Sequence, residues 1–407
     1  MAGRVKRRSS SMPARRRRRG RRGTKDTPFS SLPDDTIADI LLRLPAESVL
    51  CAGAVCKAWR SFTTDPSFLA AHARLQQAQV VMYSYLDEGP YELALDVVPF
   101  SGDDDEAARR RLIRYPRTTR TRFLLLASCN GVLLFRKSHG SFLSFLLCNP
   151  VTRQWAELPR VGRFGEAEYQ YAFYSHQPSG EYRLLLRRGL SWLILSTGAA
   201  EPRRVDMPPG TSITNSLVTA PPVALGGRLH WPPRVVAGAG MTTTTSEMMV
   251  FDTVSETFHR MAGPPTATAD MVKLFEMEGR LAAADFGEEE HVDLWFLDDY
   301  DVGRWERRHR VATAWEPDGV SRGPPQEAGD LVCVAAAGDG EGNVMLGSHL
   351  WLAVYNLRTK TARTVDSVVE AENDVLVSRH VFSASLVRHP SFAARSTADL
   401  GLTFSWS

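Results

Sequence analysis

Apolar residues recur with helical spacing in three stretches between residues 29 and 75. In the first stretch, Pro33 suits a helix start and Pro45 ends the helix. One face of this helix is apolar and comprises Ile37, Ile40, Leu41 and Leu44. A second helix is expected from about Glu47 to Arg60, and a third opens at Asp65–Pro66. These short helices carry more apolar residues than so small a core can bury, which indicates a partner or a contact with the remaining chain.

From residue 80 onward the pattern changes to short apolar runs bounded by Gly, Pro, Asn and Asp, which predict strands throughout. The predicted strands are Val80 to Tyr85, Leu93 to Val98, Phe123 to Leu126, Gly131 to Phe135, Phe142 to Cys148, Tyr169 to Tyr174, Tyr182 to Arg187, Trp192 to Leu195, Met248 to Phe251, Leu274 to Phe275, Val292 to Leu297, Val344 to Leu346, Leu350 to Leu357 and Val381 to Val387. Segments 101–111, 201–222 and 241–246 interrupt the pattern and are interpreted as rim loops.

A motif repeats among these runs: a glycine turn and a strand, followed by a second strand, an Asn or Asp turn and an aromatic residue. The four copies combine 128–133 with 148–155, 225–231 with 250–258, 278–281 with 295–305, and 342–344 with 354–361. Asn-Pro or Asp-Thr is expected to make the turn, and the following Trp or Phe to pack between sheets. The repeat predicts a β-propeller of six or seven blades over residues 80–407, with an array of β-sandwiches as the alternative. The fold class is therefore α+β and multidomain.

Charge separates the first residues from the rest of the 407-residue chain. Residues 1–25 hold twelve Lys or Arg and no acid. The formal net charge of the whole chain is +3, so the net charge of the remaining chain is −9. A basic tail of residues 1–27 with almost no apolar content is predicted to be disordered. It is interpreted as a nuclear localisation signal, a non-specific nucleic-acid contact, an organelle transit peptide, or a solvated tail without a function. The acidic body is not expected to bind nucleic acid.

Signatures of catalysis, metal binding and membrane insertion are missing from the sequence. The histidines form no H-E-x-x-H, and neither a G-x-S-x-G elbow nor a Walker loop occurs. The five cysteines are scattered without C-x-x-C spacing and are interpreted as small buried apolar residues, so neither a disulfide framework nor a zinc site is expected. No apolar run reaches the roughly 18 residues of a membrane span, and no apolar signal segment is visible at the N-terminus. No enzyme activity, cofactor, metal or membrane association is predicted.

The helical stretch resembles the F-box motif, especially in its plant form, over residues 28–76. The residues that carry this resemblance are Leu32-Pro33-Asp34-Asp35, Ile40-Leu41, Arg43-Leu44-Pro45, Ser48, Val55-Cys56-Lys57, Trp59-Arg60, Asp65-Pro66 and Phe68. The resemblance implies docking on the Skp-type adaptor of an SCF (Skp–cullin–F-box) ubiquitin ligase, and through that adaptor on a cullin. It implies adaptor contacts from Leu32, Pro33, Ile37, Ile40, Leu41, Leu44 and Pro45, and either adaptor contacts or core positions from Val55, Cys56 and Trp59. The family often has basic residues at the positions of Cys51 and Gly53. We therefore expect this chain to differ from the family in its affinity for the adaptor or in its choice among adaptor paralogues.

The β region resembles the F-box-associated, kelch-like propeller of plant F-box proteins, on the segments 128–135, 148–159 and 250–261. This resemblance implies a non-catalytic substrate receptor that presents an unknown protein for ubiquitination and proteasomal degradation, in the nucleus and/or cytoplasm. The alternative is a propeller outside any ligase that binds proteins, or nucleic acid through the Arg-rich tail.

Overall fold

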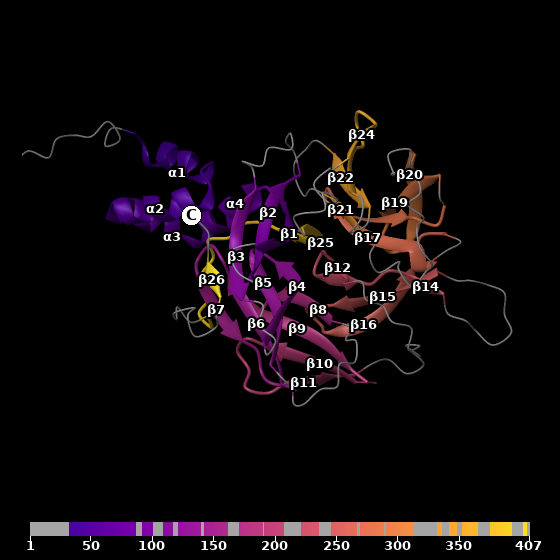
Figure 1. Ribbon diagram of the computed structural model, residues 1–407, viewed down its shortest axis with the longest axis horizontal. Coiled ribbons are helices and arrows are strands. Elements are labelled where there is room, and N and C mark those ends of the chain that lie inside the picture. The colour runs from indigo at the N-terminus through magenta and orange to yellow at the C-terminus, as the bar shows by residue number, and fades with distance from the viewer. Residues whose placement is uncertain are drawn as a thin grey trace, which may run out of the picture.

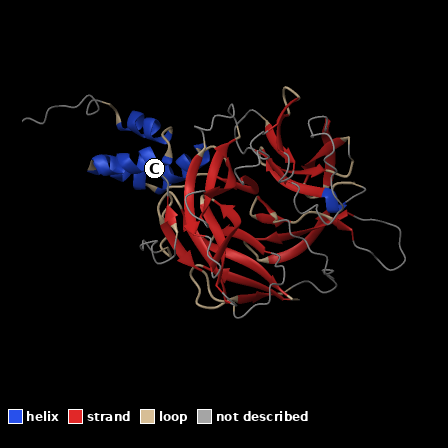
Figure 2. Cartoon of the chain, in the orientation of Figure 1, coloured by secondary structure: helices blue, strands red, loops and turns tan. Residues whose placement is uncertain are grey.

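The computed structural model consists of a small group of helices beside a ring of six β-sheets (Figure 1). It describes residues 32–86, 92–100, 109–116, 121–139, 142–161, 171–189, 191–206, 221–235, 246–266, 269–288, 290–312, 332–335, 342–347, 352–364, 375–392 and 402–404. The basic tail predicted at residues 1–27 lies outside these residues. In Figure 2 the helices gather at one outer edge of the ring of strands, apart from the 3-10 turn Ala269–Met271 at the far side.

Four helices form the N-terminal module: α1 (Asp34–Leu42), α2 (Ala46–Val55), α3 (Lys57–Thr64) and α4 (Pro66–Leu75). The helix predicted from Glu47 to Arg60 is thus two helices, because Cys56 adopts an extended conformation with φ −153° and ψ 168°. Its Sγ atom accepts a hydrogen bond from the Trp59 backbone N–H at 3.4 Å, so Cys56 caps α3. Asp65 caps α4 in the same way, accepting from the backbone N–H groups of Ser67 and Phe68.

The six sheets are six propeller blades, and we number them in chain order. Blade 1 contains β4 (Thr121–Cys129), β5 (Val132–His139), β6 (Phe142–Asn149) and β7 (Gln154–Glu157), and blade 2 contains β8 (Tyr171–His176), β9 (Glu181–Arg188), β10 (Ser191–Ser196) and β11 (Arg203–Val205). Blade 3 contains β12 (Val223–Leu225), β13 (Arg228–His230), β14 (Arg234–Val235), β15 (Ser246–Asp252) and β16 (Thr257–Ala262), and blade 4 contains β17 (Val272–Met277), β18 (Arg280–Asp285), β19 (His291–Asp299) and β20 (Arg304–Ala312). Blade 5 contains β21 (Val332–Ala335), β22 (Asn343–Gly347), β23 (Leu352–Asn356) and β24 (Thr361–Thr364), and blade 6 contains β25 (Val375–Phe382), β1 (Gln79–Leu86), β2 (Glu92–Pro99), β3 (Arg110–Pro116) and β26 (Thr403–Phe404). The prediction of a propeller is confirmed, with six blades.

Blade 6 closes the ring by joining the two ends of the propeller sequence. The C-terminal β25 pairs with β1, with Gln79 opposite Phe382, and β26 pairs with β3 at the outer edge. The first strands of most neighbouring blades contact one another, including β25 with β4. The strand predicted at Val381 to Val387 lies earlier in the chain, at residues 375–382, where it forms the innermost strand of blade 6. Residues 383–387 form no strand. Likewise, Arg110 and Arg111 begin β3 rather than ending a rim loop.

The repeated turns explain the sequence repeat. Asn149, Asp252, Asp299 and Asn356 each accept hydrogen bonds on the side-chain oxygen from the backbone N–H groups two and three residues later. The fourth residue after each of them has a positive φ: Arg153, Glu256, Gly303 and Lys360. Phe258 and Trp305, which follow two of the turns, are buried, and Trp155 is half-buried. The expected role of the Asn and Asp turns is confirmed in these four blades.

The C-terminal segment after β25 crosses the turns of blades 1 and 2. Asn149 donates from Nδ2 to the Ser385 carbonyl oxygen at 3.0 Å. Gly131 lies under the same segment, where a Cβ atom would stand 2.4 Å from the Ser385 Cβ. Farther along, His389 packs against Tyr182 of blade 2 with the ring centroids 4.7 Å apart. We call residues 383–392 the C-terminal strap, since they tie blade 6 to both following blades.

The two faces of the ring differ in their connections. Because strands alternate in direction, the turns from first to second and from third to fourth strand share one face, here called the hairpin face. The opposite face, the connection face, holds the start of each first strand and the links between blades. The longer links, 158–170, 206–222 and 313–331, begin and end there, although most of their residues lie outside the described ones. The predicted loops 201–222 and 241–246 likewise fall largely outside the described residues.

The helices and the propeller share a contact at blade 6. Glu47 of α2 accepts from Nη1 of Arg110, at the start of β3, at 2.6 Å. One apolar cluster joins the helix core to blades 6 and 1, and includes Leu41, Val49, Ile113 and Phe135. In the part of the chain that the structure describes, no helix is long and apolar enough to cross a membrane.

Glu256 links blades 2 and 3 and gives a pH prediction. It is hydrogen-bonded by Arg203 and by Arg183, the latter at 2.6 Å. Burial would raise the pKa of Glu256, but the two arginines outweigh burial and hold the pKa below its usual value. A carboxyl with a lowered folded pKa adds stability above its unfolded pKa of about 4.3 and loses it as the pH falls through the folded value.

We therefore expect Glu256→Gln to lower the free energy of unfolding by about 1–3 kcal/mol at pH 7. Denaturant unfolding at several pH values should show this deficit shrinking below about pH 4, near the unfolded pKa. Glu157→Gln, at an exposed carboxylate, is the matched control and should change little at either pH. A deficit that persisted unchanged in acid would show that charge is not its cause.

Candidate functional site

The helical module buries one apolar side and leaves a second one exposed. Leu41, Val49 and Phe68 are fully or almost fully buried and form its core. His72 of α4 bonds to the Leu44 carbonyl oxygen through Nε2 at 2.9 Å and so fixes α4 against the end of α1. On the outer side, Ile40 is 44% exposed although its neighbour in the chain, Leu41, is buried. An isolated exposed leucine is ordinary, but a group on one small module indicates a contact surface.

The predicted adaptor-contacting residues divide into three groups by exposure. Ile37 and Leu41 are buried, which favours a role in the module's own core. Leu32, Leu44 and Trp59 are half-buried. The exposed residues are Pro33, Ile40, Pro45, Val55 and Cys56. Val55 is 67% exposed, so of the roles left open for it the structure favours surface contact over the core. Cys51 and Cys56 are both exposed, unlike the small buried residues expected, because no described element covers the outer face of α2 and its end.

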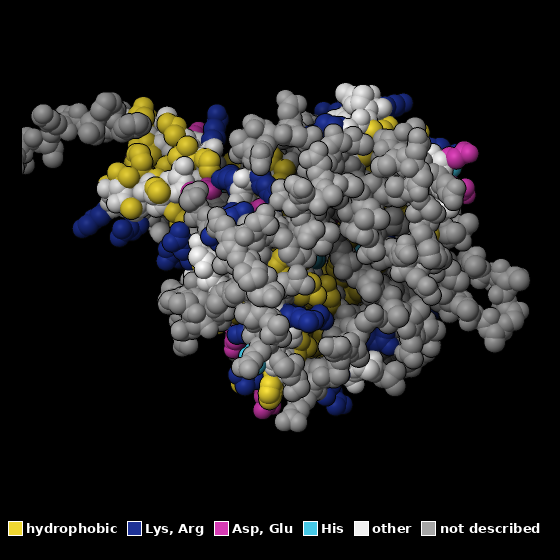
Figure 3. Space-filling model, viewed as in Figure 1, with side chains coloured by type: hydrophobic (Ala, Val, Ile, Leu, Met, Phe, Trp, Pro, Cys, Tyr) yellow, Lys and Arg dark blue, Asp and Glu magenta, His cyan; other side chains and the backbone are white. Residues whose placement is uncertain are grey.

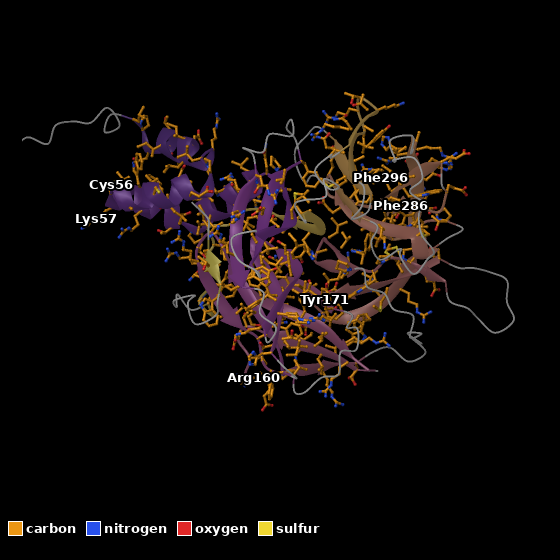
Figure 4. All side chains as sticks on the ribbon, in the orientation of Figure 1. Cys56, Lys57, Arg160, Tyr171, Phe286 and Phe296 are labelled. Carbon is orange, nitrogen blue, oxygen red and sulfur yellow. The ribbon has the colours of Figure 1, made fainter. Side chains whose placement is uncertain are left out.

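Sequence reasoning missed Leu50, Cys51 and Ala54, which are exposed on the outer side of α2. Their signal was present, since α2 has a buried face at Val49 and Ala52 and a second apolar face beside it. A helix that is apolar on two sides needs two packing partners. We call the outer side of α1 and α2 the exposed helix face; it comprises Pro33, Ile40, Leu50, Cys51, Ala54 and Val55. Figure 3 shows apolar side chains gathered over these helices, and Figure 4 places Cys56 and Lys57 at the end of the module away from the ring.

Gly53 has a packing role that offsets its low helix propensity. A Cβ atom there would lie 2.8 Å from Thr63 Oγ1 of α3. Arg60 also donates from Nε to the Gly53 carbonyl oxygen at 3.1 Å. The glycine therefore lets α2 and α3 approach closely.

His230, a buried histidine of the propeller, has a structural role. Burial lowers the pKa of His230 to about 4. Its Nε2 lies 2.8 Å from the Tyr300 hydroxyl and its Nδ1 lies 3.2 Å from the Val223 carbonyl oxygen, so it joins blade 3 to blade 4. Among the described residues, no three His, Cys, Asp or Glu side chains are grouped to hold a metal ion.

Comparison with known proteins agrees with this architecture. Residues 97–385 match the model of the F-box associated beta propeller domain, and residues 29–75 match the F-box-like model. An F-box protein of Arabidopsis thaliana is 22% identical over 322 residues, which cover 72% of this chain and 75% of that protein. An F-box/LRR-repeat protein of the same plant is 23% identical over 305 residues, 68% of this chain and 66% of that protein.

Solved structures are less similar. A lectin of Aleuria aurantia in complex with alpha-methyl-L-fucoside has a TM-score of 0.38 at 12% identity, covering 72% of this chain and 97% of the lectin. At that score the likeness has no bearing on function. The family matches extend over both parts of the chain, the helices and the ring. The chain belongs to the plant-type F-box proteins that carry an F-box associated beta propeller domain.

Proposed function

We propose that the chain is the substrate-recognition subunit of an SCF ubiquitin ligase, without catalysis of its own. In this proposal the exposed helix face binds a Skp-type adaptor, and through it a cullin, while the propeller binds a protein destined for ubiquitination and proteasomal degradation. Family membership supports the general role. The observation that carries the adaptor assignment is the apolar surface of α1 and α2, which no described element covers.

The placement of the module supports a presenting role for the propeller. The helices lie at the outer edge of blade 6, so they cover neither face of the ring (Figure 1). A substrate held on either face would be kept at a fixed position relative to the adaptor. Holding the substrate near a conjugating enzyme raises the effective concentration of its lysines, and this requires no catalytic group in the receptor. The proposed compartment is the nucleus and/or cytoplasm, on the strength of the basic tail.

Co-purification of the full chain with a panel of Skp-type adaptors tests the proposal. We expect a stable complex with at least one adaptor and little sensitivity to salt, because the surface is mainly apolar. Adding a cullin should extend this complex on size-exclusion chromatography. A folded full chain that bound none of the adaptors would overturn the assignment. Salt-sensitive RNA binding through residues 1–25 would instead favour the alternative of a nucleic-acid protein.

A further inference from the structure

Two arginines of blade 1 are directed toward blade 2 on the connection face. Leu134 of β5 is buried between these blades, so Arg136, two residues later, lies on the same side of the strand. Leu124 of β4 is paired with Arg136, and Arg122 precedes Leu124 by two residues. The register shift in β4 falls after Leu125, so Arg122 and Leu124 share this side.

Blade 2 completes the surface from the other side. Leu186 of β9 belongs to the same apolar cluster, and Arg188 follows it by two residues. Tyr171, at the start of β8, and Leu143 are half-buried and pack against that cluster; Figure 4 labels Tyr171 within the ring. We call these residues the cationic seam: Arg122, Leu124, Arg136, Leu143, Tyr171 and Arg188.

Two arginines of the seam have no acidic partner among the residues that the structure describes. Several other arginines of the propeller have carboxylate partners; Arg310, for example, meets Asp293 at 2.7 Å. Arg136 is half-buried and Arg122 exposed, and neither has an ion pair or a side-chain hydrogen bond with any described residue. Glu157 and Asp206, near the ends of the outer strands of these blades, do not pair with them. A partly desolvated guanidinium without an anion is unfavourable, so the site is suited to an incoming anion.

The apolar members of the seam decide what kind of anion fits. Leu124 is 41% exposed beside the arginines, so an apolar side chain can dock next to an acidic group. A nucleic-acid surface would extend over a basic domain, whereas the chain beyond residue 25 carries a net charge of −9. Building on the proposed function, we propose that the cationic seam binds an acidic segment of the substrate protein that carries an apolar residue. Its acid is a carboxylate or a phosphorylated side chain, both of which arginine can bind through two hydrogen bonds.

Binding of short fluorescent peptides to the full chain tests the seam. Three peptides share one leucine-containing frame, with glutamates, phosphoserines or glutamines at the variable positions. We expect both acidic peptides to bind and the glutamine peptide not to bind; the tighter of the two acidic peptides identifies the source of charge. Arg136→Met keeps the aliphatic stem and should weaken binding by about tenfold or more, the usual worth of a charged hydrogen bond.

Controls separate this proposal from trivial explanations. Arg280→Ala removes an exposed arginine from the hairpin face of blade 4 and should leave binding unchanged. If Arg136→Met does not fold, Arg122→Ala, at an exposed position, carries the same test. Equal losses in the Arg280 and Arg136 variants, or no preference for acidic over neutral peptides, would overturn the proposal. So would an RNA oligonucleotide that binds at the seam more tightly than the acidic peptides.

Adaptor capture, measured on the same proteins, distinguishes the two proposals. Arg136→Met should capture the adaptor as the natural chain does, because the seam and the exposed helix face lie on different elements. Peptide binding without adaptor capture would defeat the ligase function and leave the seam standing. Adaptor capture without acidic-peptide binding would do the reverse.

Discussion

Replacing Ile40 and Leu50 together with aspartate should weaken adaptor binding roughly 1,000-fold, since each central apolar contact is commonly worth about 2 kcal/mol or more. Both side chains are exposed in the free chain, on α1 and α2. Neither side chain belongs to the buried cluster of the module, so the substitution removes little core packing. Its cost in helix propensity is only a fraction of a kcal/mol per site. Affinity can be measured by calorimetry with a purified Skp-type adaptor.

The matched control is Val302→Asp, which places the same charge at a 74% exposed apolar residue of blade 4. It should leave the affinity for the adaptor unchanged. Thermal melting of all three proteins should be similar, which would separate loss of binding from loss of fold. An Ile40/Leu50 variant that bound as tightly as the natural chain would show that the adaptor uses another surface.

Gly131→Ala should destabilise the propeller strongly, because two penalties act at one position. Its φ is +77°, a region that costs an L-residue about 1–2 kcal/mol. The new Cβ atom would also lie 2.9 Å from the Ser383 carbonyl oxygen and from the Ser385 backbone nitrogen, as well as clashing with the Ser385 side chain. Relief requires a backbone shift of the C-terminal strap, and such overpacking typically costs about 1–3 kcal/mol more.

Gly279→Ala carries the first penalty, the positive φ, without the second. Gly279 has a φ of +75° in a similar turn, but no atom lies within 4 Å of the position of its Cβ. Comparing the two variants by denaturant unfolding should show a larger loss for Gly131→Ala, by the cost of displacing the strap. Equal losses would mean that the strap does not rest on blade 1 in solution.

Local rules predicted the repeated units well. The Asn-Pro and Asp-Thr turns were expected at the residues that form them, because their side chains satisfy nearby backbone N–H groups whatever the neighbouring blade. The helix break at Cys56 was not expected, because cysteine carries no strong signal for a cap. The innermost strand of blade 6 was also misplaced. Its pairing with β1 joins residues about three hundred positions apart, and no local pattern reports such a pairing.

The candidate sites were predicted in part. Helical periodicity identified apolar positions on α1, but it could not show that Leu41 would be covered while Ile40 stayed exposed. That distinction depends on how α4 and the other helices pack. The arginines of the cationic seam carried no recognisable motif. Arg136 becomes notable only once blade 2 is placed beside it and no described carboxylate pairs with it.

Because blade 6 takes strands from both ends of the propeller sequence, the ring cannot close before β25 has been synthesised. When residue 370 leaves the ribosome, β1 to β3 are present but lack both β25 and β26. Every nascent chain thus passes through a stage in which β1 and β3 expose unpaired backbone edges, which favour aggregation. A premature stop codon anywhere before β25 would make that stage permanent, so the propeller closes only in a chain that extends through β25.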